Sequence, residues 1–291
     1  MKKINIFCFG FGQVAKNFIN KIKSENIKIN LNVTSRNDSE KKVFNEINYN
    51  SYQFSEKNFD HLLIEKLKIS EHILVSISPI NGNDIVVKNF QKILLETKPK
   101  WITYLSATSV YGDHNGAWVN EESKTNPTSS TGIDRLKAEN TWINLSNKKN
   151  LPLQIFRLSG IYSNEKNILA RLKIGKEKII IKKNHFFSRI HVEDIANILF
   201  KSLLKFKSKE IYNISDDKPA SSEEVSSYGS TLLNINPPEK INASSVDNLV
   251  LKNFYKDSKK VSNKKMKSFF NYRLKHPTYI DGLNYIKNNF I

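Results

Sequence analysis

The chain has 291 residues, enough for one large α/β domain or for such a domain with a smaller lobe. No apolar run reaches the roughly 18 residues that a membrane span needs. The formal net charge of +18 does not indicate a nucleic-acid protein, because the lysines are scattered and lack interleaved stacking aromatics. The single cysteine, Cys8, cannot form an internal disulfide, and the first apolar stretch is too short for a signal peptide. We therefore expect a cytoplasmic protein with no nucleic-acid or membrane partner.

Strand-like and helix-like segments alternate over the first 160 residues. The expected strands are Ile4–Phe9, Ile29–Ser35, Ser51–Phe54, His72–Ile77, Trp101–Leu105 and Leu153–Leu158. The expected helices are Gln13–Ser24, Ser39–Asn45, Phe59–Leu67, Asp84–Glu96 and Thr131–Leu145. Apolar strands that alternate with helices predict the α/β class, with a doubly wound parallel Rossmann sheet.

The rhythm changes from about residue 160. Helices are expected at Asn167–Ile174, Val192–Leu204 and Tyr279–Asn289, and strands at Ile179–Ile181, Phe186–Ile190 and Glu210–Ile214. A polar stretch runs from Pro237 to about Asn253. The pattern predicts a Rossmann domain over 1–160 and a smaller C-terminal substrate lobe over 161–291, with some elements of the second part returning to the Rossmann core.

A glycine motif joins the first strand to the first helix. Gly10 permits a tight turn, Gly12 lets the backbone approach a pyrophosphate, and Ala15 is small enough for close packing of helix on strand. The helix N-terminus then offers N–H groups and a positive dipole end to the phosphates. The motif therefore predicts a dinucleotide site, whose loop residues are Gly10, Phe11, Gly12, Gln13 and Val14.

Ligands of doubly wound sheets bind at the carboxyl ends of the strands. The polar or small residues expected at that edge are Ser35, Arg36, Ser78, Ser106 and Gly160. No acid stands where an NAD site places a carboxylate for the ribose, whereas the Arg36 guanidinium suits a 2′-phosphate. The sequence thus favours NADP(H) over NAD(H).

Three further motifs follow: SATSVYG at 106–112, RLSGIY at 157–162 and SRIHVED at 188–194. With the glycine turn, they make nearly the whole chain resemble the extended short-chain dehydrogenase/reductase superfamily, of the NAD-dependent epimerase/dehydratase type. The pattern of its C-terminal part looks like an atypical branch. The resemblance implies a bound dinucleotide, a small polar substrate such as a nucleotide-sugar, and a monomer or homodimer.

The chain departs from that family at two catalytic positions. The family uses a Tyr four residues before a Lys on one helix, and a Ser or Thr on the preceding strand. Lys137 matches the Lys, but Ile133 stands at the Tyr position and Ala107 at the hydroxyl position. Neither of these two side chains can transfer a proton.

Four residues remain candidates for catalysis: Tyr111 as proton donor, Lys137 as ribose contact, and Ser106 and Thr108 as hydroxyls that hold a water. Each has a structural alternative, since buried tyrosines commonly belong to the core and Ser or Thr at a strand end commonly caps the backbone. We expect an NAD(P)-binding oxidoreductase or epimerase; the alternative is a redox-silent NADP(H) sensor or regulator. The histidines lack metal-ligand spacing, so no metal is expected.

Overall fold

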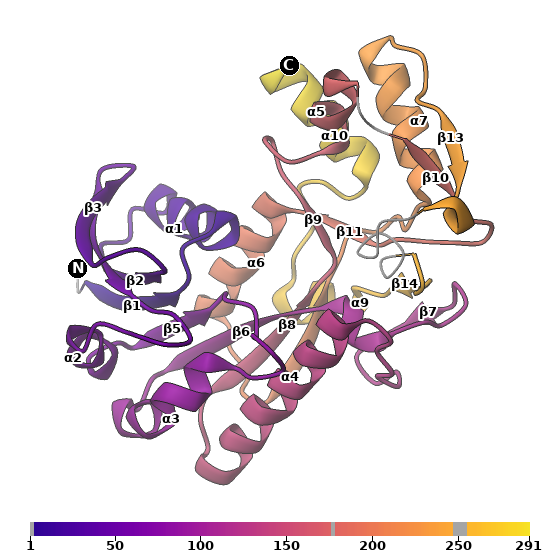
Figure 1. The fold of residues 1–291 in the computed structure, drawn as a ribbon. Helices are drawn as coiled ribbons and strands as arrows, with labels where there is room; N and C mark the ends of the chain where they lie inside the picture. Colours follow the sequence, from indigo (N-terminus) through magenta and orange to yellow (C-terminus); the bar gives the residue numbers. More distant parts are fainter. Residues whose placement is uncertain (1–2, 176–177, 247–254) are drawn as a thin grey trace. The chain divides into compact units, whose positions relative to one another are not determined.

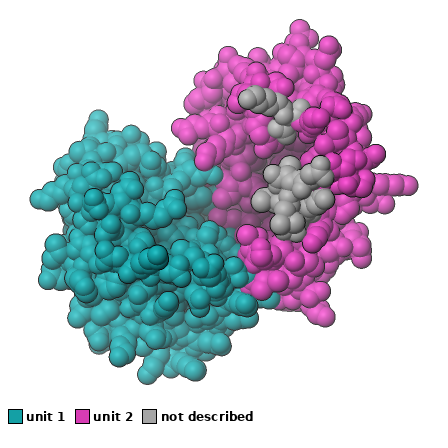
Figure 2. Space-filling view, viewed as in Figure 1, with its two compact units in different colours: residues 1–106, 134–157, 195–212 teal, residues 107–133, 158–194, 213–291 magenta. Residues whose placement is uncertain are grey.

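A computed structural model describes residues 3–175, 178–246 and 255–291. The chain divides into two compact units, each built from three segments (Figure 2). Unit 1 comprises residues 1–106, 134–157 and 195–212, and unit 2 comprises residues 107–133, 158–194 and 213–291. The chain thus returns to unit 1 late in the sequence, whereas the domain boundary at residue 160 stays a prediction.

Most of an eight-stranded, mainly parallel sheet belongs to unit 1. Its strands, in the order in which they neighbour one another, are β12 (Glu210–Ile214), β8 (Leu153–Leu158), β6 (Trp101–Ala107), β5 (His72–Val75), β1 (Ile4–Phe9), β2 (Ile29–Ser35), β4 (Ile47–Gln53) and β3 (Glu40–Phe44). β1 pairs in parallel with β2 and with β5. Four consecutive residues of β1, from Ile6 to Phe9, are fully buried, as expected for a strand covered on both faces. The predicted α/β Rossmann fold is confirmed.

Helices cover both faces of this sheet (Figure 1). They are α1 (Gln13–Ser24), α2 (Leu62–Lys68), α3 (Ile85–Thr97), α4 (Ser130–Lys149) and α6 (Val192–Leu204). On one face the Trp101 ring stacks on Phe18 of α1, and its indole N–H donates to Ser202 of α6. On the other face the core contains Phe90 of α3 and Trp142 of α4, and the Trp142 indole donates to Asp84, the N-cap of α3.

The expected helix Ser39–Asn45 is wrong. The segment forms β3, which pairs antiparallel with β4 in a hairpin closed by Asn45 and Glu46. Both turn residues have positive φ, 46° and 63°, which is the geometry of a two-residue turn whose twist matches that of the strands. The turn at Asn45 and Glu46 therefore determines the conformation of this short charged segment, which forms a strand and not a helix.

Unit 2 packs three helices around one core. They are α5 (Ile168–Ile174), α7 (Ser222–Leu233) and α10 (Tyr279–Phe290). Parallel two-stranded pairs accompany them: β9 (Gly160–Tyr162) with β11 (Arg189–His191), β10 (Ile179–Ile181) with β13 (Lys240–Asn242), and β7 (Trp118–Val119) with β14 (Lys260–Val261). The described residues of the unit also form the 3-10 helices Thr108–Tyr111 and Ala243–Ser245 and the helix α9 (Lys264–Phe270).

Two helices of unit 2, α7 and α9, are absent from the expected elements. α7 begins with a reciprocal capping box, in which Ser221 accepts from the Glu224 N–H and Glu224 accepts from the Ser221 N–H. This signal is visible in the sequence. The polar stretch expected up to Asn253 lies partly outside the described residues. Among the described helices, none combines the length and the apolar character needed to cross a membrane.

Candidate functional site

The glycine turn of unit 1 has the geometry that a dinucleotide loop needs. Gly10 has φ of +88°, and a Cβ there would lie 2.8 Å from the side chains of Ser76 and Ile77. Its N–H donates to Thr34 Oγ1 at 2.9 Å, which ties the turn to β2. A Cβ at Gly12 would meet nothing within 4 Å. Gly10 is therefore required by the turn itself, whereas the space beside Gly12 is open.

The helix that follows, α1, begins without a side-chain cap. Gly12 is its N-cap, and Val14 and Ala15 are buried against the sheet. Because glycine has no side chain, the N-cap residue accepts no hydrogen bond from the N–H groups of the first helical turn. These N–H groups are suited to bind an anionic ligand. Phe11 packs on Phe44 of the hairpin, with ring centroids 5.4 Å apart. Of the predicted loop residues, Gly10, Phe11 and Gly12 therefore form the turn, and Gln13 and Val14 begin α1.

The residues at the end of β2 lie on the surface. The Ser35 hydroxyl donates to the Asn37 carbonyl at 3.2 Å. Arg36 is exposed. The nearby carboxylate of Asp38 accepts from the Gln53 amide at 3.2 Å. Arg36 is therefore the exposed cation at the strand end.

Helix α4 places two basic residues differently. The Arg135 guanidinium donates to Ser78 Oγ at 2.6 Å and to the Leu105 carbonyl at 2.8 Å, so it bridges the ends of β5 and β6. Lys137 is exposed, and a Cβ at Gly82 would lie 3.5 Å from its Nζ. Lys137 is therefore beside the turn that follows Ser78. Sequence reasoning missed Arg135, because two residues along an α-helix separate it from Lys137 and the two side chains therefore leave different faces.

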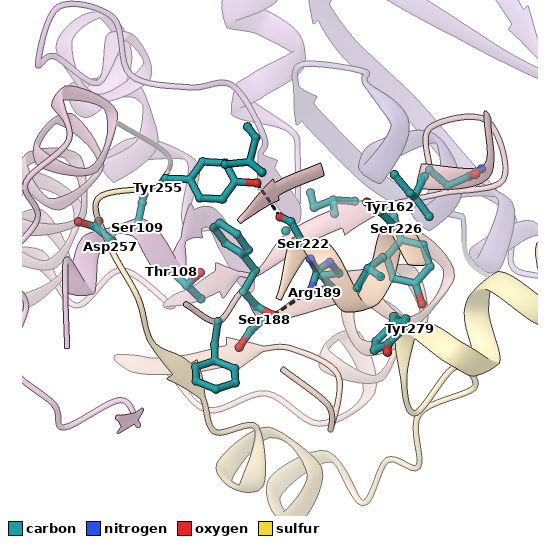
Figure 3. Close-up of a pocket in the computed structure, with 18 of the residues that line it drawn as sticks. Thr108, Ser109, Tyr162, Ser188, Arg189, Ser222, Ser226, Tyr255, Asp257 and Tyr279 are labelled. Atoms are coloured by element: carbon teal, nitrogen blue, oxygen red, sulfur yellow. Dashed lines mark hydrogen bonds between the residues drawn. The ribbon is translucent and has the colours of Figure 1, made fainter. Parts of the chain in front are cut away.

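A cavity of about 880 Å³ lies wholly within unit 2 (Figure 3). Hydroxyl groups from four separate segments line it, among them Thr108, Ser129, Ser188 and Ser222. Tyr255 donates to Ser222 at 2.7 Å across this wall. Gly160 also lines the cavity. Two of the predicted site residues, Thr108 and Gly160, are thus brought together here.

Two other catalytic candidates lie elsewhere. Tyr111 is fully buried and its phenol donates to Asn213 Oδ1 at 2.7 Å. Ser106 is 3% exposed and belongs to unit 1. Neither is among the described residues that line the cavity. This placement favours a core role for Tyr111 over proton donation.

Charged side chains in the cavity wall are mostly basic. Five basic residues line it, namely Lys166, Arg171, Lys178, Arg189 and Lys259, with Asp257 as the acidic residue among the described lining. Arg189 donates to the carbonyls of Phe187 and Ala220, and burial lowers its pKa. Burial raises the pKa of Asp216, while the nearby Arg189 opposes the rise. The wall therefore favours an anionic ligand.

A group of metal-ligand type occurs elsewhere in unit 2. One ligand atom each of His191, Glu193 and His276 lies within 4.8 Å of the others. However, Glu193 Oε2 is already 2.9 Å from His276 Nε2 and 2.8 Å from the Lys275 ammonium. The Glu193 carboxylate oxygen is therefore already in contact with two nitrogen atoms, one from His276 and one from Lys275.

The sequence and the fold were compared with known proteins. Residues 76–215 match the family model "NAD dependent epimerase/dehydratase family". The expected resemblance to the NAD-dependent epimerase/dehydratase type is confirmed over these residues, which carry a domain of that family. No curated protein matches the sequence.

Solved structures extend the match to nearly the whole chain. A functionally unknown conserved protein from Silicibacter pomeroyi has a TM-score of 0.83 at 29% identity, with 98% of each chain covered. UDP-N-acetylglucosamine 4-epimerase from Bacillus cereus has a TM-score of 0.76 at 16% identity, covering 98% of this chain and 99% of that one. A dTDP-glucose 4,6-dehydratase from Streptomyces venezuelae, with NAD and TYD bound, has a TM-score of 0.80 at 14% identity, covering 97% and 95%. The last two likenesses show the fold alone.

Proposed function

We propose that the protein is an NAD(P)-dependent oxidoreductase or epimerase that acts on a small anionic substrate of the nucleotide-sugar type. The proposal rests on one feature of each unit. Unit 1 has a glycine turn at positive φ beside a helix without a side-chain cap, and unit 2 has a large cavity whose charged lining residues are mainly basic. The family match to an epimerase/dehydratase domain supports the same reading.

The loop of unit 1 fits a dinucleotide. The open space at Gly12 and the α1 N-terminus would receive the pyrophosphate. When bound, the nicotinamide would supply the hydride acceptor or donor. Ser78 and Lys137, at the end of β5 and on α4, are the proposed contacts toward the ribose. The cofactor contact expected of Gly160 stays a prediction.

We further propose that the cofactor is NADP(H) rather than NAD(H). Arg36 is exposed at the end of β2, where a 2′-phosphate would lie, and its guanidinium can bind a phosphate through two donors. The nearest acid, Asp38, is engaged by Gln53 and is two residues further on. The NAD bound in the dTDP-glucose 4,6-dehydratase structure is a property of that protein, which is only 14% identical.

The cavity supports the substrate class. A diphosphate carries negative charge that the basic wall of unit 2 can neutralise, and hydroxyls such as Thr108 and Ser222 can bind sugar oxygens. The Bacillus cereus neighbour is an epimerase of UDP-N-acetylglucosamine. We propose a cytoplasmic location, a monomer or homodimer, and no nucleic-acid partner, as expected from the sequence.

A second candidate is a redox-silent NADP(H) sensor. Ala107 and Ile133 lack proton-transfer groups, and the Tyr111 phenol is buried on Asn213. A sensor would bind the dinucleotide without turnover. The two functions therefore share the loop and differ only in catalysis.

Calorimetric titration of NADPH and NADH tests the shared step. Gly12→Ala places a methyl group in the open space, so we expect unchanged thermal stability and at least a tenfold loss of dinucleotide affinity. Absence of binding to the parent protein would overturn both functions. Turnover of UDP-N-acetylglucosamine or dTDP-glucose, read by product NMR and NADPH absorbance, would decide for the enzyme.

A further inference from the structure

The cavity of unit 2 contains an ionisable pair that the family pattern does not predict. Lys259 and Asp257 both line it, and the side chains are 11% and 9% exposed. Lys259 Nζ lies 3.7 Å from Asp257 Oδ2. Such a separation is an ion pair without a tight hydrogen bond. The amine is therefore enclosed and close to a carboxylate, in a residue that lines the cavity together with the hydroxyl-bearing residues of the wall.

The pair is held in place by contacts from distant parts of the chain. Asp257 Oδ1 accepts from the Thr128 hydroxyl at 2.6 Å. Asp113 Oδ1 accepts from the Ser258 N–H at 2.7 Å, which fixes the backbone between Asp257 and Lys259. Thr128 immediately precedes Ser129, Ser130 and Thr131, which also line the cavity. These three residues lead along the chain into Ile133, the position of the missing tyrosine.

Other ionisable groups of the wall suit proton transfer less well. Burial raises the pKa of Tyr162, and a Cβ at Gly282 would lie 2.0 Å from its hydroxyl, so the phenol is closely packed against α10. The Tyr255 hydroxyl is engaged with Ser222. Arg189 holds two backbone carbonyls. Lys259 is the cavity cation whose described partner is a single carboxylate 3.7 Å away.

We propose that Lys259, held beside Asp257 in the wall of this cavity, is the catalytic residue that takes up and returns the substrate proton in place of the missing tyrosine. The proposal rests on the proposed oxidoreductase or epimerase function. A neutral amine accepts the proton of a substrate hydroxyl while the carbon-bound hydrogen leaves as hydride to the oxidised dinucleotide. A carbonyl forms; in the reverse step the ammonium returns the proton as hydride is added.

The enclosure of Lys259 shifts its pKa in the direction that a proton acceptor needs. Burial lowers the pKa of the amine, while the carboxylates of Asp257 and Asp113 oppose that shift. Two cationic or titratable groups are also near this region: Lys182, which lowers the pKa of Asp113, and the buried His185, whose own pKa falls to about 4. A catalytic base works best when its pKa lies near the operating pH.

The first test needs no substrate. Reductive methylation with ¹³C-formaldehyde gives each lysine a methyl signal that moves as the amine titrates, and Lys259→Arg identifies the signal of Lys259. We expect this signal to titrate at lower pH than the exposed lysines. Asp257→Asn should lower the titration further, because it removes the nearest negative charge. Titration of Lys259 together with the exposed lysines would overturn the proposal.

The second test uses turnover with the panel of nucleotide-sugars. Lys259→Gln should lower kcat by about 10²–10⁴-fold, with dinucleotide affinity unchanged and the pH dependence of kcat lost. Lys260→Gln is the matched control, since Lys260 is the next residue but lies over the Phe186 ring and does not line the cavity. It should retain the parent kcat.

The outcomes separate this proposal from the proposed function. If the parent protein turns over substrate and Lys259→Gln keeps kcat within threefold, or changes only KM, Lys259 is not the proton-transfer residue. If the parent protein binds no dinucleotide or turns over none of the substrates, the proposed enzyme function fails and the role of Lys259 fails with it.

Discussion

The phenol of Tyr111 and the amide oxygen of Asn213 form a 2.7 Å hydrogen bond in which both residues are fully buried. Asn213 is held in turn by its own amide, which donates to the Ser262 carbonyl at 3.2 Å, and by its N–H, which donates to Glu121. Tyr111, four residues after the missing hydroxyl position at Ala107, is thus part of a connected polar network within unit 2.

Tyr111→Phe should therefore act on stability rather than on turnover. The substitution leaves Asn213 Oδ1 buried without its donor, which costs about 1–3 kcal/mol. We expect this loss in urea unfolding, together with a kcat within a few-fold of the parent value. A kcat reduced by a hundredfold or more with unchanged stability would instead restore Tyr111 as the proton donor.

The features that follow from local sequence could be predicted. The strand, glycine turn and helix from Ile4 to Ser24 depend on neighbouring residues only, and the structure gives β1 and α1 the expected bounds. The hairpin was not predicted because its main sequence signal is the two-residue turn Asn45-Glu46. The charged residues around this turn show no clear alternation of apolar and polar side chains.

The cavity residues could not be predicted in the same way. Lys259 and Asp257 are positioned by Asp113 and Thr128, which lie well over a hundred residues earlier in the chain. A local sequence pattern does not predict contacts between residues so far apart in the chain unless both belong to a known motif. Arg135 is a similar case, because its role depends on the carbonyl of Leu105 and the hydroxyl of Ser78.

Arg36→Glu tests the cofactor preference. A carboxylate at this position repels a 2′-phosphate and can accept a hydrogen bond from a ribose hydroxyl. We expect NADPH affinity to fall at least tenfold and NADH affinity to stay the same or rise, measured by calorimetry at moderate salt. Lys41→Glu, an equal charge change on the exposed strand β3, is the control and should leave the NADPH-to-NADH ratio unchanged. An unaltered ratio in Arg36→Glu would remove the NADP(H) preference.

Removal of one partner from the buried ion pair of Arg157 and Glu139 should strongly destabilise unit 1. The guanidinium donates to both carboxylate oxygens, and the side chains are 5% and 1% exposed. Glu139→Gln leaves a buried, uncompensated charge and should cost about 3–5 kcal/mol in urea unfolding. The exposed pair of Lys68 and Glu96 supplies the control, since Glu96→Gln should cost less than about 1 kcal/mol. Equal effects of the two substitutions would contradict this assignment.

Acid should destabilise the fold from about pH 6.5 downward. Burial, reinforced by the neighbouring His276, lowers the pKa of His191 from 6.5 to about 3, and burial lowers that of His185 to about 4. Below pH 6.5 the unfolded chain therefore binds protons that the folded chain does not, so the free energy of unfolding decreases as the pH falls.

Glu193 adds to this loss at lower pH. Hydrogen bonds from His276 and Lys275 lower its pKa to about 2, from an ordinary value of 4.5, so the stabilisation present above pH 4.5 disappears as the pH falls toward 2. Urea unfolding over a series of pH values measures both steps. Glu193→Gln should flatten the curve below pH 4.5 and leave the decline between pH 6.5 and 4.5 in place, because that decline comes from the buried histidines. A free energy of unfolding that stays constant between pH 6.5 and 4.5 would show that His191 and His185 are not held neutral by burial.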